Sequence, residues 1–186
     1  MRREYTPITA HANKSLIRVY SCAFAGILVC SLQAGEPAPS PHDFVQEFYN
    51  WYCPKTLQDN PGRTWDIAVK QKSALFSPEL LRALEEDSAA SDKAVGDIVG
   101  LDFDPFLYSQ DPAARFEVGP ITAKGAGWLV EVHAVEAGRK NRKPAVVAEL
   151  SPVNGRWQFV NFHYEGNLNL VSILKTLRQD REKDAK

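Results

Sequence analysis

The segment 102–111, DFDPFLYSQD, holds three carboxylates, a phenol and an amide within ten residues. Their polar atoms could line the rim of a pocket that binds a ligand, a partner or a cation; the side chains are Asp102, Asp104, Tyr108, Gln110 and Asp111. A calcium loop is not predicted, because the closely alternating oxygen ligands, the glycine and the terminal glutamate of such loops are absent.

Loop architecture alone can also explain this segment, and we favour that interpretation. Asp104 stands before Pro105, where a carboxylate accepts backbone N–H groups and starts a turn. Asp111 stands before Pro112 and could do the same ahead of the first strand. Apolar side chains between the carboxylates would plug the core; they are Phe103, Phe106 and Leu107.

No other local motif predicts a catalytic, metal or cofactor site. The nucleophile elbow GxSxG, the Walker loop, the dinucleotide-binding GxGxxG and the redox motif CxxC do not occur. No pair of histidines or cysteines has the spacing of zinc ligands. We therefore predict no metal and no cofactor.

The charges give no reason to expect a nucleic-acid partner. The formal net charge is -1, from 22 basic and 23 acidic side chains. Residues 1–34 hold four basic groups and one acid, which leaves 18 basic and 22 acidic groups, a net charge of -4, in residues 35–186. A basic leader before a mildly acidic body is typical of an exported protein rather than of a polyanion binder.

Residues 1–34 predict a signal peptide that is cleaved near Ala34. The stretch 19–35, VYSCAFAGILVCSLQAG, is uncharged and apolar, and Lys14 and Arg18 precede it. A basic region, a short apolar region and a small residue follow one another in this order in export signals. The body is therefore expected to be periplasmic or secreted. The alternative is an uncleaved inner-membrane anchor, because the run is near the lower length limit for spanning a bilayer.

Only one of the three cysteines belongs to the predicted mature chain. Cys22 and Cys30 lie in the leader, and the large Val29 before Cys30 argues against a lipid anchor. Cys53 is then left without a partner for an internal disulfide. It could be a reactive or intermolecular thiol, but a small buried apolar residue at the end of a helix is the favoured interpretation.

The body begins with a helical pattern after a linker at 35–41. Ser40 and Pro41 are a typical N-cap and first helical residue. Apolar side chains follow at helical spacing, and Pro54 is expected to end this helix.

Three further helices are expected. The second covers 64–75, and the third starts at the cap Ser77 and runs to about residue 90. The last lies in 167–186, where the mixed charges after Arg178 predict a frayed, soluble end.

From Arg115 the apolar period changes to two, which predicts an antiparallel meander. Four strands are expected, near 115–118, 128–134, 145–150 and 157–164. A basic turn, GRKNRKP, and the strong hairpin signal Asn154-Gly155 connect them. The class is therefore α+β, with N-terminal helices packed on a curved antiparallel sheet of about four strands and a C-terminal helix. A curved sheet around a long helix is expected to leave a cavity or groove.

Five motifs, in their order along the chain, resemble the DUF3828 family; they are FVQEFYNWY, SPELLRALEED, DFDPFLYSQD, WLVEVHAV and GRWQFVNFHYEG. The resemblance covers roughly 42–166 and leaves 167–186 as an additional helix and charged tail. That family consists largely of exported bacterial proteins and lipoproteins of unknown function, and it is similar to the cone-shaped NTF2-like fold. The resemblance implies this fold and an envelope setting, but no reaction.

The same resemblance suggests candidate catalytic residues by analogy. In NTF2-like enzymes an acid or base among apolar walls transfers protons, which makes His163 at the end of the last strand a candidate. Tyr108 and Asp102 could act with it, although nothing in their spacing requires the three to meet. A histidine at a strand end is more often a structural residue, so we expect no enzyme.

We therefore predict a non-enzymatic binding or interaction protein of the bacterial envelope. Its partner would be an envelope protein or a small ligand, and a membrane only if the leader stays uncleaved. The resemblance also allows a homodimer formed through the sheets. The basic turn could contact anionic headgroups or an acidic partner, but a solvated tip that protects the sheet edge is favoured.

Two alternatives stay open. One is a small cavity enzyme that performs acid–base chemistry on a small hydrophobic substrate. The other is an immunity-type inhibitor of an envelope-targeted toxin, which the expected compartment, the size and the mild acidity of the body suggest.

Overall fold

The computed structural model describes residues 39–58, 63–94, 99–110 and 113–184. The predicted signal peptide lies outside these residues, as do Asp111 and most of the predicted linker. Of the helices in the described part, none combines the length and the apolar character needed to cross a membrane.

Helix α1 (Pro41–Thr56) begins where the sequence predicts. Ser40 caps it, because its Oγ accepts a hydrogen bond of 3.1 Å from the backbone N–H of the third helical residue. The prediction that Pro54 ends the helix is wrong, since Pro54 lies inside the last turn. A proline there removes only one backbone hydrogen bond, and Thr56 Oγ1 donates at 2.9 Å to the carbonyl oxygen of Cys53 beside it.

The second predicted helix is divided into α2 (Thr64–Gln71) and a 3-10 turn, η1 (Ser73–Leu75). Helix α3 (Pro78–Lys93) starts at the predicted cap, where Ser77 Oγ accepts at 3.2 Å from the backbone N–H of Leu80. It buries Leu80, Leu84 and Asp87 on one face.

Five antiparallel strands follow; they are β1 (Phe116–Lys124), β2 (Gly127–Glu136), β3 (Arg139–Lys140), β4 (Val146–Val153) and β5 (Arg156–His163). Their order is β1-β2-β4-β5, and the short β3 pairs with the end of β2 inside the predicted basic turn. The hairpin turn Asn154-Gly155 has φ angles of 49° and 73°, which match the right-handed twist of the strands. The predicted α+β class is confirmed, with one more short strand than expected.

Residues of the helical segments bond to the backbone of both edge strands, β1 and β5. On β1, Gln46 Nε2 of α1 donates at 3.1 Å to the Phe116 carbonyl, and Gln46 Oε1 accepts at 2.9 Å from the N–H of Val118. On β5, the Ser77 N–H donates at 2.9 Å to the Phe159 carbonyl. These groups satisfy edge positions that would otherwise be open to pairing with another chain.

Aromatic rings fill the space between α1 and the sheet, where the sequence predicts a cavity or groove. The ring centroid of Phe48 lies 5.4 Å from Tyr52, 5.6 Å from Phe106 and 5.0 Å from Phe159. The fully buried aromatic side chains are Tyr49, Tyr52, Phe76, Phe106, Phe116, Phe159 and Phe162. In the described residues these rings occupy the space between α1 and the sheet, which the sequence leaves open as either a pocket or a filled interior.

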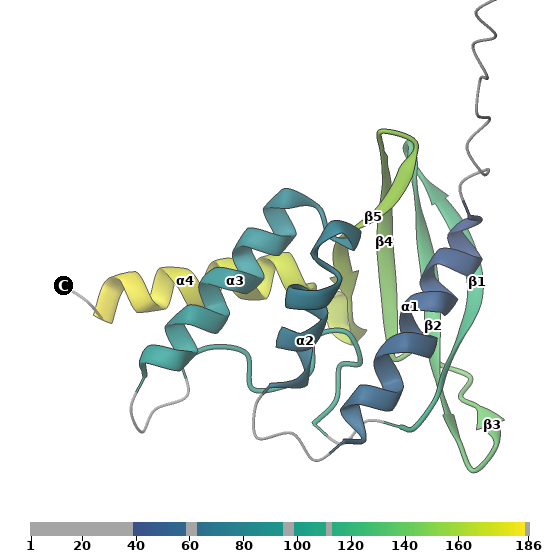
Figure 1. Cartoon of the computed structure of the whole chain (residues 1–186), viewed down its shortest axis with the longest axis horizontal. Coiled ribbons are helices and arrows are strands. Elements are labelled where there is room, and N and C mark those ends of the chain that lie inside the picture. The colour runs from purple at the N-terminus through teal and green to yellow at the C-terminus, as the bar shows by residue number, and fades with distance from the viewer. Residues whose placement is uncertain (1–38, 59–62, 95–98, 111–112, 185–186) are drawn as a thin grey trace, which may run out of the picture. The chain divides into compact units, whose positions relative to one another are not determined.

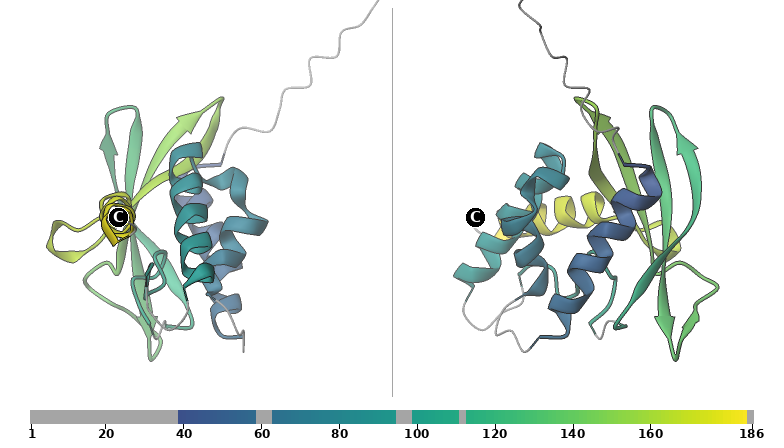
Figure 2. Two further views of the ribbon diagram at one scale, coloured as in Figure 1. Left: turned by 90° about the vertical axis from the view of Figure 1, so that its left-hand side faces the viewer. Right: turned by 45° about the vertical axis from the view of Figure 1, so that its right-hand side comes forward.

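Helix α4 (Leu170–Asp184) follows a 3-10 turn, η2 (Glu165–Asn167), and packs beside α3 (Figures 1 and 2). Its charged half contacts α3 through two arginines. Arg178 Nη1 lies 3.2 Å from Glu86 Oε2, and Arg181 Nη1 lies 2.7 Å from Asp87 Oδ1. Residues three apart share one face of a helix, so Arg178 and Arg181 bind α3 with the same face of α4. The prediction of a frayed end is therefore wrong for α4 up to Arg181.

Candidate functional site

A cleft of about 620 Å³ lies between the end of α1, the start of α2, the end of α3 and the segment 99–110. This volume is in the range of pockets that bind small molecules or inserted side chains. The polar residues of its wall include Arg63, Ser91, Asp102, Asp104 and Gln110. The sequence-predicted segment thus forms one wall of the cleft, and residues that no sequence motif singles out form the other.

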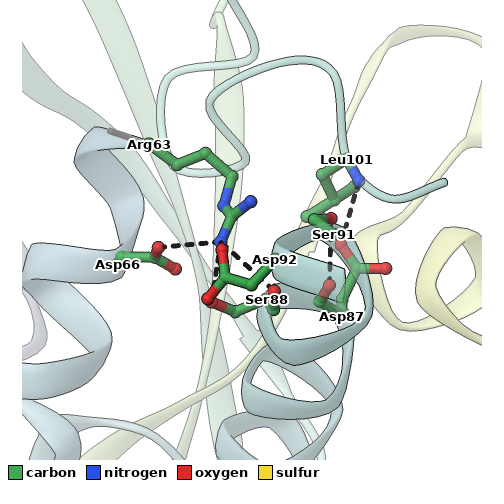
Figure 3. A network of polar contacts seen from close by, with 7 residues as sticks. All are labelled: Arg63, Asp66, Asp87, Ser88, Ser91, Asp92 and Leu101. Carbon is green, nitrogen blue, oxygen red and sulfur yellow. Dashed lines mark hydrogen bonds and ion pairs between the residues drawn. The ribbon is translucent and has the colours of Figure 1, made fainter. Parts of the chain in front are cut away.

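Arg63, directly before α2, joins that helix to α3 (Figure 3). Its Nη2 lies 3.1 Å from Asp66 Oδ2 and 2.6 Å from Asp92 Oδ1, and it donates at 3.0 Å to Ser88 Oγ. The guanidinium lies over the ring of Trp65, with its carbon 5.5 Å from the centroid. The charge of Arg63 is thus matched by two carboxylates of the protein itself.

Asp87 of α3 holds the segment 99–101 through the backbone of Leu101 (Figure 3), and it also contacts α4. Its side chain is completely buried; Oδ2 accepts at 2.9 Å from the N–H of Leu101, and Oδ1 lies 2.7 Å from Arg181 Nη1. The same arginine nitrogen donates at 2.9 Å to the Val99 carbonyl. A Cβ on Gly100 would collide with Ser91 Oγ and lie 2.7 Å from Asp87 Oδ2, so a larger residue there would displace the side chains that hold this segment to α3.

A sequence signal for Asp87 exists, although we did not predict its role. Asp87 continues the spacing of Leu80 and Leu84 on the buried face of α3. A carboxylate in a buried position needs a cation or hydrogen-bond donors beside it. Its partner Arg181 lies 94 residues further along the chain, so no local pattern points to the pair. Arg63 was missed for a similar reason, since its contacts depend on the packing of α2 against α3.

Three tyrosine hydroxyls hold the part of the loop around Pro105. Tyr52 donates to the carboxylate of Asp104, Tyr164 donates at 2.7 Å to the Pro105 carbonyl, and Tyr49 donates at 2.7 Å to the Phe106 carbonyl. Asp104 Oδ1 also accepts from the N–H of Phe106 at 2.9 Å, which is the turn contact that the Asp-Pro sequence predicts. The loop wall is therefore anchored to α1 and to the residue after β5.

Burial raises the pKa of Asp104 to about 6, although the Tyr52 hydroxyl and two backbone N–H groups favour its charged form. The ordinary pKa of an aspartate is 3.8. Between about pH 4 and 6, the folded protein therefore keeps a proton on Asp104 that the unfolded chain has released. The stability from this group is complete below about pH 4 and is lost as the pH rises through about 6. We expect the deprotonation of Asp104 to lower the free energy of unfolding by about 2–3 kcal/mol between pH 4 and 7.

Urea denaturation of the wild type and of Asp104→Asn at pH 4 and pH 7 tests this linkage, because asparagine does not titrate. The wild type should lose about 2–3 kcal/mol relative to the variant on going to pH 7. The exposed Asp102→Asn is the matched control in the same loop and should track the wild type. A difference between wild type and Asp104→Asn that is constant with pH contradicts the prediction.

The structure brings together some of the predicted binding residues and separates others. Asp102, Asp104 and Gln110 all line the cleft, and Gln110 Nε2 donates at 3.1 Å to the Asp102 carbonyl. Tyr108 has a φ of 50° and stacks on Tyr164 with a centroid distance of 4.3 Å, outside the cleft lining. Asp111 lies outside the described residues.

His163 lies on the other face of the sheet from the tyrosine stack. Its neighbours Phe162 and Tyr164 are buried on the helix-covered face, and successive residues of extended chain point to opposite faces. His163 Nε2 lies 2.7 Å from Glu149 Oε2, and Lys124 Nζ lies 2.9 Å from Glu149 Oε1. The candidates His163 and Tyr108 therefore do not meet in one pocket.

Cys53 has the structural role that the sequence favours. The residue is buried, and burial raises the pKa of its thiol to about 12. A thiol with this pKa holds its proton at neutral pH and is a poor nucleophile. Within the described ranges, no three histidine, cysteine, aspartate or glutamate side chains lie close enough to hold a metal ion.

Comparisons with known proteins find one distant structural similarity. No family model and no curated protein matches the chain. A similar chain occurs in the crystal structure of the type VI native effector–immunity complex Tae3–Tai3 from Ralstonia pickettii. The match covers 69% of this chain and 98% of that chain, with 18% sequence identity and a TM-score of 0.47. A similarity this low transfers no function, so the site rests on its own residues.

Proposed function

We propose that this chain is an exported protein of the bacterial envelope that binds a partner protein through the cleft and catalyses no reaction. The observation that carries the proposal is the anchored loop wall. Asp87 and Arg181 hold the segment at 99–101, and three tyrosine hydroxyls hold it at 104–106. A wall that is ordered before binding loses little conformational entropy when a partner docks.

Two further features favour binding over acid–base catalysis. The interior between α1 and the sheet is filled by aromatic rings, so a small hydrophobic substrate would have to displace them. His163 is paired with Glu149 on the opposite face of the sheet from Tyr108, whereas proton transfer needs its groups within hydrogen-bond reach of one substrate. Export and membership of the DUF3828 family are parts of this proposal that rest on the leader and on the motifs in 42–166.

An immunity-type inhibitor that neutralises an envelope-targeted toxin is the second candidate. It is a special case of partner binding, and the size and the net charge of -4 of residues 35–186 support it. The Ralstonia pickettii structure is an effector–immunity complex. The similarity is too low to support this candidate, but a toxin is a class of partner that the test should include.

Site-specific photocrosslinking tests the proposed function. A benzoylphenylalanine at Gln110 in the cleft should give one discrete adduct in an envelope extract of cells that produce the chain. The same group at Arg156, exposed near the β4–β5 turn, is the control and should give none. Excess unlabelled protein should compete with the adduct, and mass spectrometry would identify the partner. No adduct from Gln110, or the same adduct from both positions, would contradict binding through the cleft.

A further inference from the structure

The charged groups of the cleft are unequally matched. The charged lining residues are Arg63, Asp102 and Asp104. Arg63 already has carboxylate partners in Asp66 and Asp92. Asp102 is exposed, and within the described part of the chain no cationic group lies within ion-pair distance of either Asp102 or Asp104. The cleft therefore offers negative charge to an incoming cation.

The loop holds these acceptors in place. The donors to Asp104 are neutral groups, the Tyr52 hydroxyl and the N–H groups of Phe106 and Leu107, and they orient its carboxylate without neutralising it. Gln110 is oriented by the hydrogen bond from its Nε2 to the Asp102 carbonyl, which leaves Oε1 as a further acceptor. A preorganised set of acceptors loses little entropy when a donor arrives.

The rest of the lining suits a long side chain with an apolar stem. Leu101, Phe103 and Trp65 also line the cleft. Phe103 is half-buried, whereas Leu101 and Trp65 are almost fully buried, so Phe103 offers most of the apolar surface. Methylene groups pack on such surfaces while the charged end reaches polar groups. The volume of about 620 Å³ has space for one such side chain and the backbone on either side of it.

We propose that this cleft receives an arginine side chain of the partner protein. The guanidinium would face Asp102, Asp104 and Gln110, and its stem would lie along Phe103. Arginine fits better than lysine, because its five donors in one plane can reach several separated acceptors, whereas an ammonium acts as a compact point charge. This inference rests on the proposed function and specifies its partner.

Nitrogen-15 NMR titration of the full chain tests the inference with three small probes. N-acetyl-arginine methylamide should shift the amide signals of Gly100, Phe103 and Gln110 saturably, with a dissociation constant on the order of millimolar, as expected for one side chain. The citrulline analogue has the same shape without the charge and should bind at least about tenfold more weakly. The lysine analogue should bind more weakly than arginine.

Two variants localise the binding. Asp102→Asn removes an exposed carboxylate and should weaken the binding of the arginine probe by about three- to tenfold. Glu47→Gln changes an exposed carboxylate on α1 that does not line the cleft, and should leave binding unchanged.

The arginine inference is overturned by the absence of saturable shifts up to about 100 mM probe, or by equal binding of citrulline or lysine. It is also overturned if Asp102→Asn binds like the wild type. A Gln110 crosslink without arginine binding removes this inference and leaves the proposed function, whereas arginine binding without a crosslinked protein leaves a cation site and removes the proposed function.

Discussion

Replacing Asp87 with alanine is expected to lower the free energy of unfolding by about 3–5 kcal/mol. The carboxylate is completely buried and lies 2.7 Å from Arg181 Nη1 and 2.9 Å from the N–H of Leu101. Its removal leaves a largely buried guanidinium without its carboxylate and a buried N–H without an acceptor. The loss therefore exceeds the stabilisation that the pair itself contributes.

Glu86→Ala is the matched control for this prediction. Glu86 is the preceding residue of α3 and also faces an arginine of α4, Arg178, but both side chains are substantially exposed. Solvent screens such a pair, so the loss of Glu86 should lower the free energy of unfolding far less than the loss of Asp87 does. Urea denaturation followed by circular dichroism compares the two variants. Similar losses in both would show that Asp87 does not anchor α4 and the loop.

Replacing Phe106 with alanine is expected to cost about 3–5 kcal/mol of the free energy of unfolding. Although it lies in a loop, its ring is fully buried among aromatic side chains of α1, of the segment before α3 and of β5. The centroids of Phe76 and Phe162 lie 5.3 and 5.1 Å from that of Phe106. The variant leaves a cavity that a close-packed interior refills only in part.

Tyr108→Ala provides the comparison within the same loop. Tyr108 is 38% exposed and stacks on Tyr164, so we expect a loss of about 1 kcal/mol. The midpoints of urea denaturation, at equal slopes, measure both losses. A Phe106→Ala variant no less stable than Tyr108→Ala would contradict the placement of this loop in the core.

These two anchors also bear on the proposed binding site. Asp87 holds one end of the segment 99–110, and Phe106 holds its middle. A variant that weakens either anchor without unfolding the chain should weaken binding at the cleft, because the partner would then have to order the wall.

Several features could be predicted from the sequence because they depend on neighbouring residues. The caps at Ser40 and Ser77 each need only a hydroxyl three residues before a backbone N–H. Asn154-Gly155 specifies a tight turn because both residues adopt positive φ readily. The alternation from residue 115 onward predicts the sheet, since side chains of a strand alternate between its faces.

Other features could not be predicted because distant segments decide them. The interior is filled because aromatic side chains of α1, of the loop and of β5 meet there, and their combined volume is known only once the segments are packed. Tyr108 stacks on Tyr164, whereas His163, the preceding residue, points to the opposite face and pairs with Glu149. The separation of Tyr108 from His163 therefore depends on a contact between the loop and the end of the sheet.

For this protein, the sequence by itself determined the α+β class, the starts of the first three helices, the hairpin turn and the presence of a polar loop at 102–111. These depend on backbone preferences and side-chain periods that act over a few residues. The tertiary structure alone decided that this loop forms the wall of a cleft, and that Asp87 and Arg181 hold it. An ion pair between residues 94 positions apart exists only when α3 and α4 are packed together, and its strength depends on the burial that this packing creates.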